Sequence, residues 1–223
     1  MSVVFNAAAD RIYSTTSVPS YNSAYTSRFW FQSTGSAFEI VWALNDGSSN
    51  YDDVYIRDTS IVGMDTQAGY VDGSTLTRPN WYHVCAVRET TTSLKLYING
   101  TLSATNTVNI AGRAASNRIE WGGFASFNYA PLSGAIAHPA VFTYAFNSTE
   151  VAADMTGLQP QSYTNCWGYW PLTGLSLADS SGSGNNLTSA GTLTEGADPT
   201  FGQPVAKRWQ NIPFARIQRI GVN

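Results

Sequence analysis

Apolar and polar residues alternate along several short stretches of the chain, which is the pattern of half-buried strands. The clearest alternation runs along 81–87 (WYHVCAV) and 94–98 (LKLYI). The second stretch ends in Asn99-Gly100, a dipeptide that accepts positive φ at both central positions of a two-residue hairpin turn. Residues 36–45 (SAFEIVWALN) predict another strand, and 54–58 with 61–65 predict a second hairpin. The pattern therefore favours an all-β antiparallel fold.

One short helix interrupts this pattern. Asn147 can cap its first turn, and Glu150, three residues later, can reach back to the backbone of the cap. The local signals together predict a two-sheet β-sandwich with one short helix.

Composition fits a large β domain. The chain has 223 residues, of which 43% are apolar and 13% aromatic, and its 19 glycines and nine prolines suit many short strands joined by turns. Only 12% of the residues are charged, about half the usual share. A surface of Ser, Thr, Asn and Gly is typical of extracellular and virion β proteins.

The order of the motifs along the chain indicates a resemblance to a known family. Trp81-x-His83-Val, the hairpin at Asn99-Gly100, Gly122-Gly123, Gly134-x-Ile136 and the short helix follow one another as in known domains. The chain resembles the laminin G-like branch of the concanavalin A-like lectin/glucanase superfamily. This resemblance implies a two-sheet antiparallel jelly roll, a buried Trp30 in an early strand, and binding rather than catalysis.

A further segment that resembles a family feature lies late in the chain, after the predicted helix. The stretch from Cys166, CWGYWPLTGLSLADSSGSGNN, resembles the segment that normally opens a laminin G-like domain. It is either a truncated second unit or a closing segment that returns to the sandwich. Because about thirty residues cannot bury a second core, we expect one domain over residues 1–200, followed by a tail over 201–223.

Catalytic groups are not evident. Laminarinase-like relatives carry Glu-x-Asp-x-x-Glu on one strand, and the nearest match here is Asp52-Asp53 with Asp58, which we interpret as solvated acids in a loop entering a strand. His83 is expected to be a packed, hydrogen-bonded side chain, and His138 lacks a partner motif. Cys85 and Cys166 are interpreted as buried free thiols, with a single disulfide bridge between them as the alternative. We expect no enzyme activity.

Calcium is a separate question, because many relatives hold this ion. Asp10 corresponds to one family ligand, but Ala137 and His138 stand where the resemblance implies an acidic pair. Since calcium needs six or more oxygen ligands, we expect no metal and no other cofactor. The oxygen-rich loops at 46–53 and 179–186 leave calcium as an alternative.

Two clusters are candidates for glycan binding, which uses aromatic faces beside amide and carboxylate groups. Large aromatic residues in loops are more often tucked beneath the loop than exposed, whereas Trp30, Trp81 and Trp170 lie in strand-like runs and are expected in the core. The first cluster is Phe124, Phe127, Asn128 and Tyr129, in which the rings of Phe124, Phe127 and Tyr129 are expected to form the stacking platform. The second cluster is Tyr51, Asp52 and Asp53.

The tail has a different character. Residues 201–223 contain four basic residues and no acidic one, whereas the rest of the chain is net acidic. The tail either folds against its own sandwich or docks onto another protein chain; nucleic-acid binding is disfavoured by the acidic body. The expected docking residues are Lys207, Arg208, Trp209, Ile212, Phe214, Arg216, Ile217, Arg219 and Ile220.

The N-terminal sequence lacks the basic and apolar regions of a secretory signal, and no apolar run is long enough to cross a membrane. Together with the Ser/Thr/Gly-rich surface and the basic tail, this suggests a bacteriophage virion-surface protein, a head decoration or tail adhesion protein present in symmetric copies. The expected partners are other virion subunits, copies of the chain itself and cell-surface glycans. The alternatives are a purely structural cement or spacer without a glycan ligand and a hydrolase fragment.

Overall fold

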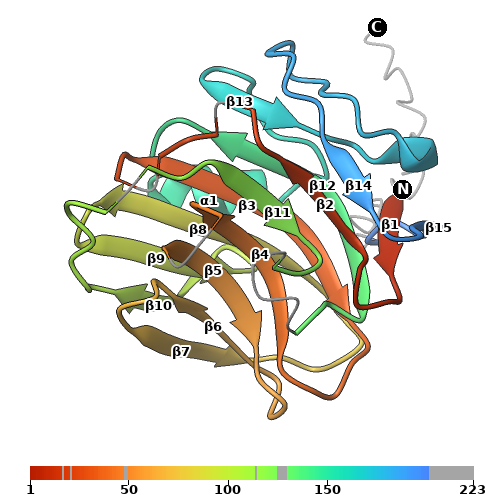
Figure 1. Cartoon of the computed structure of the whole chain (residues 1–223), viewed down its shortest axis with the longest axis horizontal. Coiled ribbons are helices and arrows are strands. Elements are labelled where there is room, and N and C mark those ends of the chain that lie inside the picture. The colour runs from red at the N-terminus through yellow and green to blue at the C-terminus, as the bar shows by residue number, and fades with distance from the viewer. Residues whose placement is uncertain (17, 21, 48–49, 114, 125–129, 201–223) are drawn as a thin grey trace, which may run out of the picture.

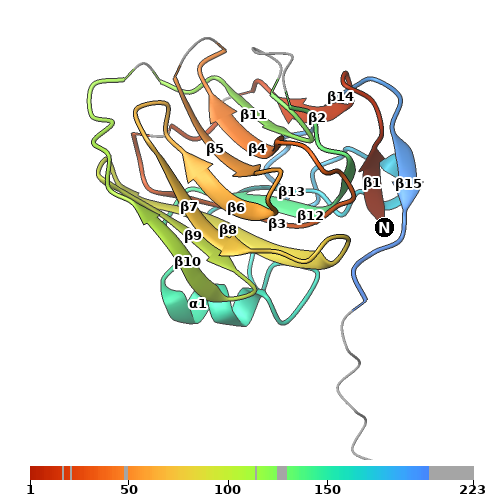
Figure 2. The same cartoon turned by 90° about the horizontal axis from the view of Figure 1, so that it is seen from below.

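Two antiparallel sheets pack face to face in this computed structural model (Figures 1 and 2). The structure describes residues 1–16, 18–20, 22–47, 50–113, 115–124 and 130–200. The first sheet has the strand order β10-β9-β8-β3-β12-β1-β15, with β13 also paired to β12. The second sheet has the order β14-β2-β11-β4-β5-β6-β7.

The strands of the first sheet are β1 (Ser2–Phe5), β3 (Tyr25–Ser33), β8 (Trp81–Thr90), β9 (Ser93–Ile98), β10 (Thr101–Asn106), β12 (Gly134–Phe142), β13 (Cys166–Tyr169) and β15 (Thr194–Gly196). The second sheet contains β2 (Arg11–Ser14), β4 (Glu39–Asn45), β5 (Tyr51–Ile56), β6 (Ile61–Asp65), β7 (Tyr70–Thr75), β11 (Arg118–Trp121) and β14 (Thr188–Ala190). The helix α1 spans Ser148–Asp154, and a 3₁₀ turn, η1, spans Thr173–Leu175. The predicted all-β jelly-roll sandwich with one short helix is confirmed.

The local signals act where they were predicted. Asn99 and Gly100 have φ of 48° and 76° between β9 and β10, so the dipeptide supplies the two left-handed residues that the hairpin turn requires. At α1, the Asn147 side chain accepts from the backbone of Glu150, and the Glu150 carboxylate accepts from the backbone N–H of Asn147. The helix therefore begins with the predicted capping box.

The main core lies between the sheets. Trp42, Trp121 and Trp170 are completely buried there, and the rings of Trp121 and Trp170 meet edge to face at 5.5 Å. Trp30 is buried as predicted, but its ring lies against His83 at 5.1 Å, outside the main core cluster. Trp81 is only partly buried, so its expected place in the core is wrong; it begins β8, where the strand emerges at the end of the sheet.

The segment that starts at Cys166 adds strands to both sheets. β13 pairs with β12, β14 pairs with β2, and β15 pairs with β1. The segment also supplies Trp170 and Leu172 to the main core. It therefore lies on the same sandwich as the preceding residues, without a core of its own.

Helix α1 packs on the face of the first sheet that points away from the second sheet (Figure 2). Under it, Cys85 and Cys166 are both buried and free, as expected from the sequence. In the described part of the chain, no helix has the length and apolar character needed to cross a membrane. The predicted docking tail, with Lys207, Trp209 and Arg216, lies outside the described residues.

Candidate ligand-binding pocket

Strand β5 presents two different faces. Val54 and Ile56 point between the sheets and belong to the main core, so by the two-residue period of a strand Tyr51, Asp53 and Tyr55 point outward from the second sheet. Asp52 and Asp53 were expected to be solvated acids in a loop, and this is wrong. Both lie within β5 and are buried, with 0% and 4% of their surface exposed.

The inward-facing Asp52 is a structural residue. Its carboxylate pairs with the buried guanidinium of Arg88 at 2.6 Å and accepts a hydrogen bond of 2.8 Å from the hydroxyl of Tyr25. All three side chains lie inside the sandwich, so a ligand on the surface cannot reach Asp52. This candidate binding residue is therefore reassigned to the core.

The outward-facing residues form a row across the second sheet. Directly opposed residues on neighbouring strands point to the same side, and the registers place six of them in line. From β2 to β7 they are Tyr13, Glu120, Ala43, Asp53, Asp65 and Tyr70. Two tyrosines thus end a row that carries three acids and one small residue.

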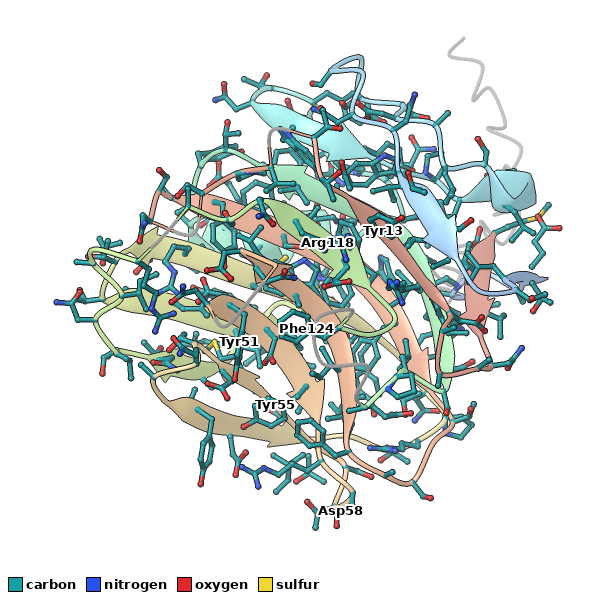
Figure 3. All side chains as sticks on the ribbon, in the orientation of Figure 1. Tyr13, Tyr51, Tyr55, Asp58, Arg118 and Phe124 are labelled. Atoms are coloured by element: carbon teal, nitrogen blue, oxygen red, sulfur yellow. The ribbon has the colours of Figure 1, made fainter. Side chains whose placement is uncertain are left out.

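A cavity of about 280 Å³ opens over the β5–β6 part of this row. Figure 3 shows three of its rings, those of Tyr51, Tyr55 and Phe124, gathered over β4 and β5, with Tyr13 and Arg118 farther along the same face. Ile40, Asp53, Tyr55 and Phe124 are buried and form the floor, whereas Tyr70 is 65% exposed and lies at the rim. The lining residues are Phe38, Ile40, Tyr51, Asp53, Tyr55, Arg57, Asp65, Tyr70 and Phe124.

Aromatic contacts hold the walls of this pocket. Phe38 stacks on Tyr55 with 5.4 Å between the ring centroids, and Phe124 meets the edge of Tyr51 at 5.3 Å. Phe124 packs in a small cluster with Ile40 and Ala43 and is only 3% exposed. Its expected role as an exposed stacking platform is therefore wrong, because its ring is used to cover the sheet.

The cation of the pocket is already paired. The guanidinium of Arg57 donates to Asp72 at 2.7 Å, and the Tyr55 hydroxyl donates to the same carboxylate oxygen at 2.7 Å. Arg57 also lies over the ring of Tyr70, at 4.8 Å. These contacts place Arg57 on the β7 side of the pocket and balance its charge with that of Asp72.

The acids of the pocket have no such balance. Asp53 and Asp65 are directly opposed on β5 and β6, and each has one buried carboxylate oxygen without a hydrogen-bond partner. Burial, followed by the charge of Asp65, raises the pKa of Asp53 well above its ordinary value. The Tyr51 hydroxyl lies 3.4 Å from the other oxygen of Asp65. The floor of the pocket therefore offers acceptor oxygens from two carboxyl groups, whose ionised forms have no cation partner among the described residues.

A shallower groove adjoins the pocket and shares Phe38 with it. The groove runs past Gly35, Ser36, Pro131 and Ser133. Its acid, Glu39, accepts hydrogen bonds from the Ser33 hydroxyl and the Ser133 backbone, so this carboxylate is used within the protein.

The pocket contains members of both predicted binding clusters. Tyr51 and Asp53 from one cluster and Phe124 from the other line the same pocket, although they are far apart in sequence. Phe127, Asn128 and Tyr129 lie outside the described residues. Sequence reasoning missed Phe38, Tyr55, Arg57, Asp65 and Tyr70. The alternation of Tyr51, Asp53, Tyr55 and Arg57 was the signal that could have revealed two of them, Tyr55 and Arg57.

Other acidic sites are satisfied internally. The carboxylate of Asp10 accepts three backbone N–H groups, from Asn6, Ala7 and Thr192, at 2.8 to 2.9 Å. Asp179 likewise accepts backbone N–H groups from Tyr169, Ser181 and Asn185. These two acids therefore close loops within the protein, Asp10 at the position of the family ligand and Asp179 in the loop at 179–186.

A cluster of His83, Cys85 and Asp154 brings three potential ligand atoms within 4.8 Å of one another. However, the Arg28 guanidinium occupies this site and donates to Asp154 at 2.6 Å, and His83 lies 2.9 Å from the same oxygen. Burial raises the pKa of Cys85 well above its ordinary value, so the thiol keeps its proton. A buried arginine beside a protonated thiol does not fit a metal ion, and His83 has the packed, hydrogen-bonded role that was predicted.

Solved structures share this fold at low sequence identity. A Bacteroides ovatus protein, named as a candidate carbohydrate binding protein, matches with a TM-score of 0.67 and 16% identity over 89% of this chain and 60% of its own. The heptameric SAP-like pentraxin of Limulus polyphemus matches with a TM-score of 0.58 and 13% identity over 85% of this chain and 94% of its own. The CBM40 of the Ruminococcus gnavus IT-sialidase, bound to α2,6 sialyllactose, matches with a TM-score of 0.56 and 17% identity over 70% of this chain and 96% of its own.

Sequence comparison gives the family. No curated protein matches the chain with significant similarity. A family profile described as the concanavalin A-like lectin/glucanases superfamily, Laminin_G_3, matches residues 7–152. Since this match spans more than half of the chain and agrees with the two-sheet sandwich and its motifs, the chain belongs to the concanavalin A-like lectin/glucanase superfamily.

Proposed function

We propose that this protein is a non-catalytic glycan-binding module and that the glycan binds in the pocket on the outer face of the second sheet. The observation that carries the proposal is the combination of aromatic walls with unpartnered carboxylate oxygens in one cavity. Aromatic faces stack on the apolar face of a pyranose, and carboxylates accept its hydroxyl groups. The carbohydrate-binding proteins among the structures of the same fold support this class of ligand.

The acid pair does not suit hydrolysis. A retaining glycosidase places two carboxyl groups about 5 Å apart on either side of the bond that it breaks, and one of them attacks the sugar. Asp53 is only 4% exposed, on the floor of the pocket, so it can accept a hydrogen bond from a ligand group but cannot attack an anomeric carbon. We therefore expect no release of reducing sugar from β-glucans.

A glycan array followed by calorimetric titration tests the binding. Tyr70 lies at the rim and its ring is mostly exposed, so Tyr70→Ala should weaken binding of the best array glycan by about tenfold, the upper range for one stacking contact. Its thermal midpoint should stay close to that of the wild type. The matched control is Tyr163→Ala, which removes another exposed tyrosine from the loop before β13.

Two results would contradict the proposal. One is an array on which no glycan binds above background. The other is a glycan whose affinity is unchanged in both Tyr70→Ala and Tyr51→Ala, because the binding site would then lie elsewhere on the molecule.

The proposed setting is the surface of a bacteriophage virion, where copies of the chain would display this pocket toward host glycans. The low share of charged residues and the basic tail over 201–223 support this setting. In this proposal the tail docks onto neighbouring virion subunits, so that the glycan pocket stays free.

A further inference from the structure

We infer that the pocket selects glycans that carry free, protonated amino groups, and that the facing carboxyl groups of Asp53 and Asp65 receive the ammonium group. This inference rests on the proposed glycan-binding function and names the class of glycan. It starts from an observation that a neutral sugar does not explain: two acids face each other in a small space, and no cation of the described residues is paired with either.

The nearby cations are committed to other groups. Arg57 pairs with Asp72, and Arg88 pairs with Asp52 on the opposite side of the sheet. Arg113 donates to the backbone carbonyl of Tyr51 at 3.4 Å. Glu120, the third acid of the row, has its own partners, since Asn45 donates to it at 2.8 Å and Arg11 lies 4.0 Å away. Among the described residues, no cation is thus paired with Asp53 or Asp65.

The surroundings of the pair favour an ammonium group over a hydroxyl. A sugar hydroxyl could donate one hydrogen bond to a carboxylate oxygen, but it would leave the negative charge in place. An ammonium group donates up to three hydrogen bonds and neutralises charge at the same time, and such charge-assisted bonds are about twice as strong. The aromatic rings of Tyr51, Phe38 and Tyr55 around the acids add attraction for a cation.

The same arrangement links binding to protons. Burial and the neighbouring acid raise the pKa of Asp53, and an incoming ammonium group stabilises the ionised form of the pair, so binding is linked to release of a proton. Affinity should therefore rise with pH until the amine of the ligand loses its own proton. The charged and titratable groups around the pair come from several elements. They are Tyr51, Asp52 and Tyr55 on β5, Arg57 directly after β5, Asp65 on β6, Tyr70 and Asp72 on β7, Glu120 on β11 with Arg11 on β2, and Arg113.

Acidic sugars are excluded by the same charge. The Ruminococcus gnavus CBM40 of similar fold holds sialyllactose, whose sialic acid carries a carboxylate. In the pocket described here, that group would face Asp53 and Asp65. We therefore expect the two proteins to prefer different sugars although they share a fold.

Calorimetric titration with two matched oligosaccharides tests the inference. The first is a hexamer of β-1,4-linked glucosamine, and the second is its fully N-acetylated counterpart, both at a slightly acidic pH at which the free amines are protonated. The wild type should bind the first at least about tenfold more tightly, as one charge-assisted hydrogen bond implies. Asp53→Asn and Asp65→Asn should each remove most of this preference while keeping the shape of the pocket.

The matched control is Asp58→Asn, which removes the same charge from the exposed turn between β5 and β6 (Figure 3). It should bind both hexamers as the wild type does. Thermal midpoints of all variants identify any loss of folding, and the preference of the wild type is itself a test that needs no variant.

Three outcomes would overturn the inference. Equal affinity for the two hexamers would leave the glycan-binding function intact and refute the amine preference. Loss of the preference in Asp58→Asn as well would assign it to overall charge. Equally tight binding of a lysine-containing tripeptide would assign the amine site to peptides. Absence of binding to every oligosaccharide would instead contradict the proposed function.

Discussion

At the scale of one residue, Asp53 on the floor of the pocket makes the stability of the protein depend on pH. Its burial beside Asp65 raises its pKa above the ordinary value of 3.8, so the folded state holds a proton that the unfolded state releases. When the folded state binds more protons, stability falls as pH rises. The contribution of Asp53 to stability is therefore complete below its ordinary pKa and is lost as pH rises from there through the raised pKa.

Asp53→Asn should remove this dependence, because the amide carries no charge at any pH. At neutral pH we expect the variant to be more stable than the wild type by about 1–3 kcal/mol, the range for relieving a poorly satisfied buried polar group. At a pH below the ordinary pKa of a carboxyl group, the two proteins should be nearly equal. Urea denaturation at both pH values measures the difference, and a difference that does not change with pH would refute the explanation.

At the scale of elements, α1 is held to the first sheet by ion pairing as well as by apolar contact. Asp154, the last residue of the helix, is buried between Arg28 on β3 and His83 on β8. Arg28 also donates to the backbone carbonyls of His138 and Leu158. One arginine thus connects the sheet to the helix and to the chain that follows it.

Asp154→Ala should be strongly destabilising, because it leaves the buried guanidinium of Arg28 without its counter-ion. We expect a loss of about 3–5 kcal/mol in the free energy of unfolding, as for other broken buried ion pairs. Chemical denaturation measures it, with Asp58→Ala as the exposed control that should change stability little. A loss below about 1 kcal/mol would mean that the pair contributes no more than a surface ion pair.

The elements also show what the sequence could predict. The hairpin at Asn99-Gly100 and the cap of α1 depend on residues close in sequence, and both were predicted correctly. The pocket depends on which residues of β4, β5 and β6 lie opposite one another, and a register shift in β4 between Ile40 and Trp42 changes the face of the residues beyond it. The sequence identified Tyr51 and Asp53 as candidates. It could not place Asp65 opposite Asp53, because this requires the register between β5 and β6.

At the scale of the whole molecule, the sandwich depends on strands from both ends of the described chain. Trp170 has no exposed surface and packs against Trp121 of β11, and the segment after it pairs with β1 and β2. Removal of residues 161–223 should therefore expose a large core ring and unfold the protein, since loss of one buried Trp alone costs about 3–5 kcal/mol.

Truncation after Gly202 should instead leave a folded sandwich with a nearly unchanged thermal midpoint, because the described residues already close both sheets. It should also abolish assembly with copies or partners if the tail is a docking arm. Circular dichroism and size-exclusion chromatography compare the two truncations. If only the protein that lacks residues 161–223 unfolds, the domain ends before the tail, as predicted. If the protein truncated after Gly202 unfolds as well, the tail is part of the domain.

The first residue of the chain and the end of its described part lie together. The N-terminal ammonium group of Met1 pairs with the carboxylate of Asp198, beside β1 and β15. Met1 and Asp198 therefore lie close together in the fold, and a linker of a few residues would be enough to join these two positions. With these positions joined, new termini can be placed at a turn, such as the one after β9, to give a circular permutant. The domain can also be inserted into a surface loop of a host protein, because the chain enters and leaves it at neighbouring points.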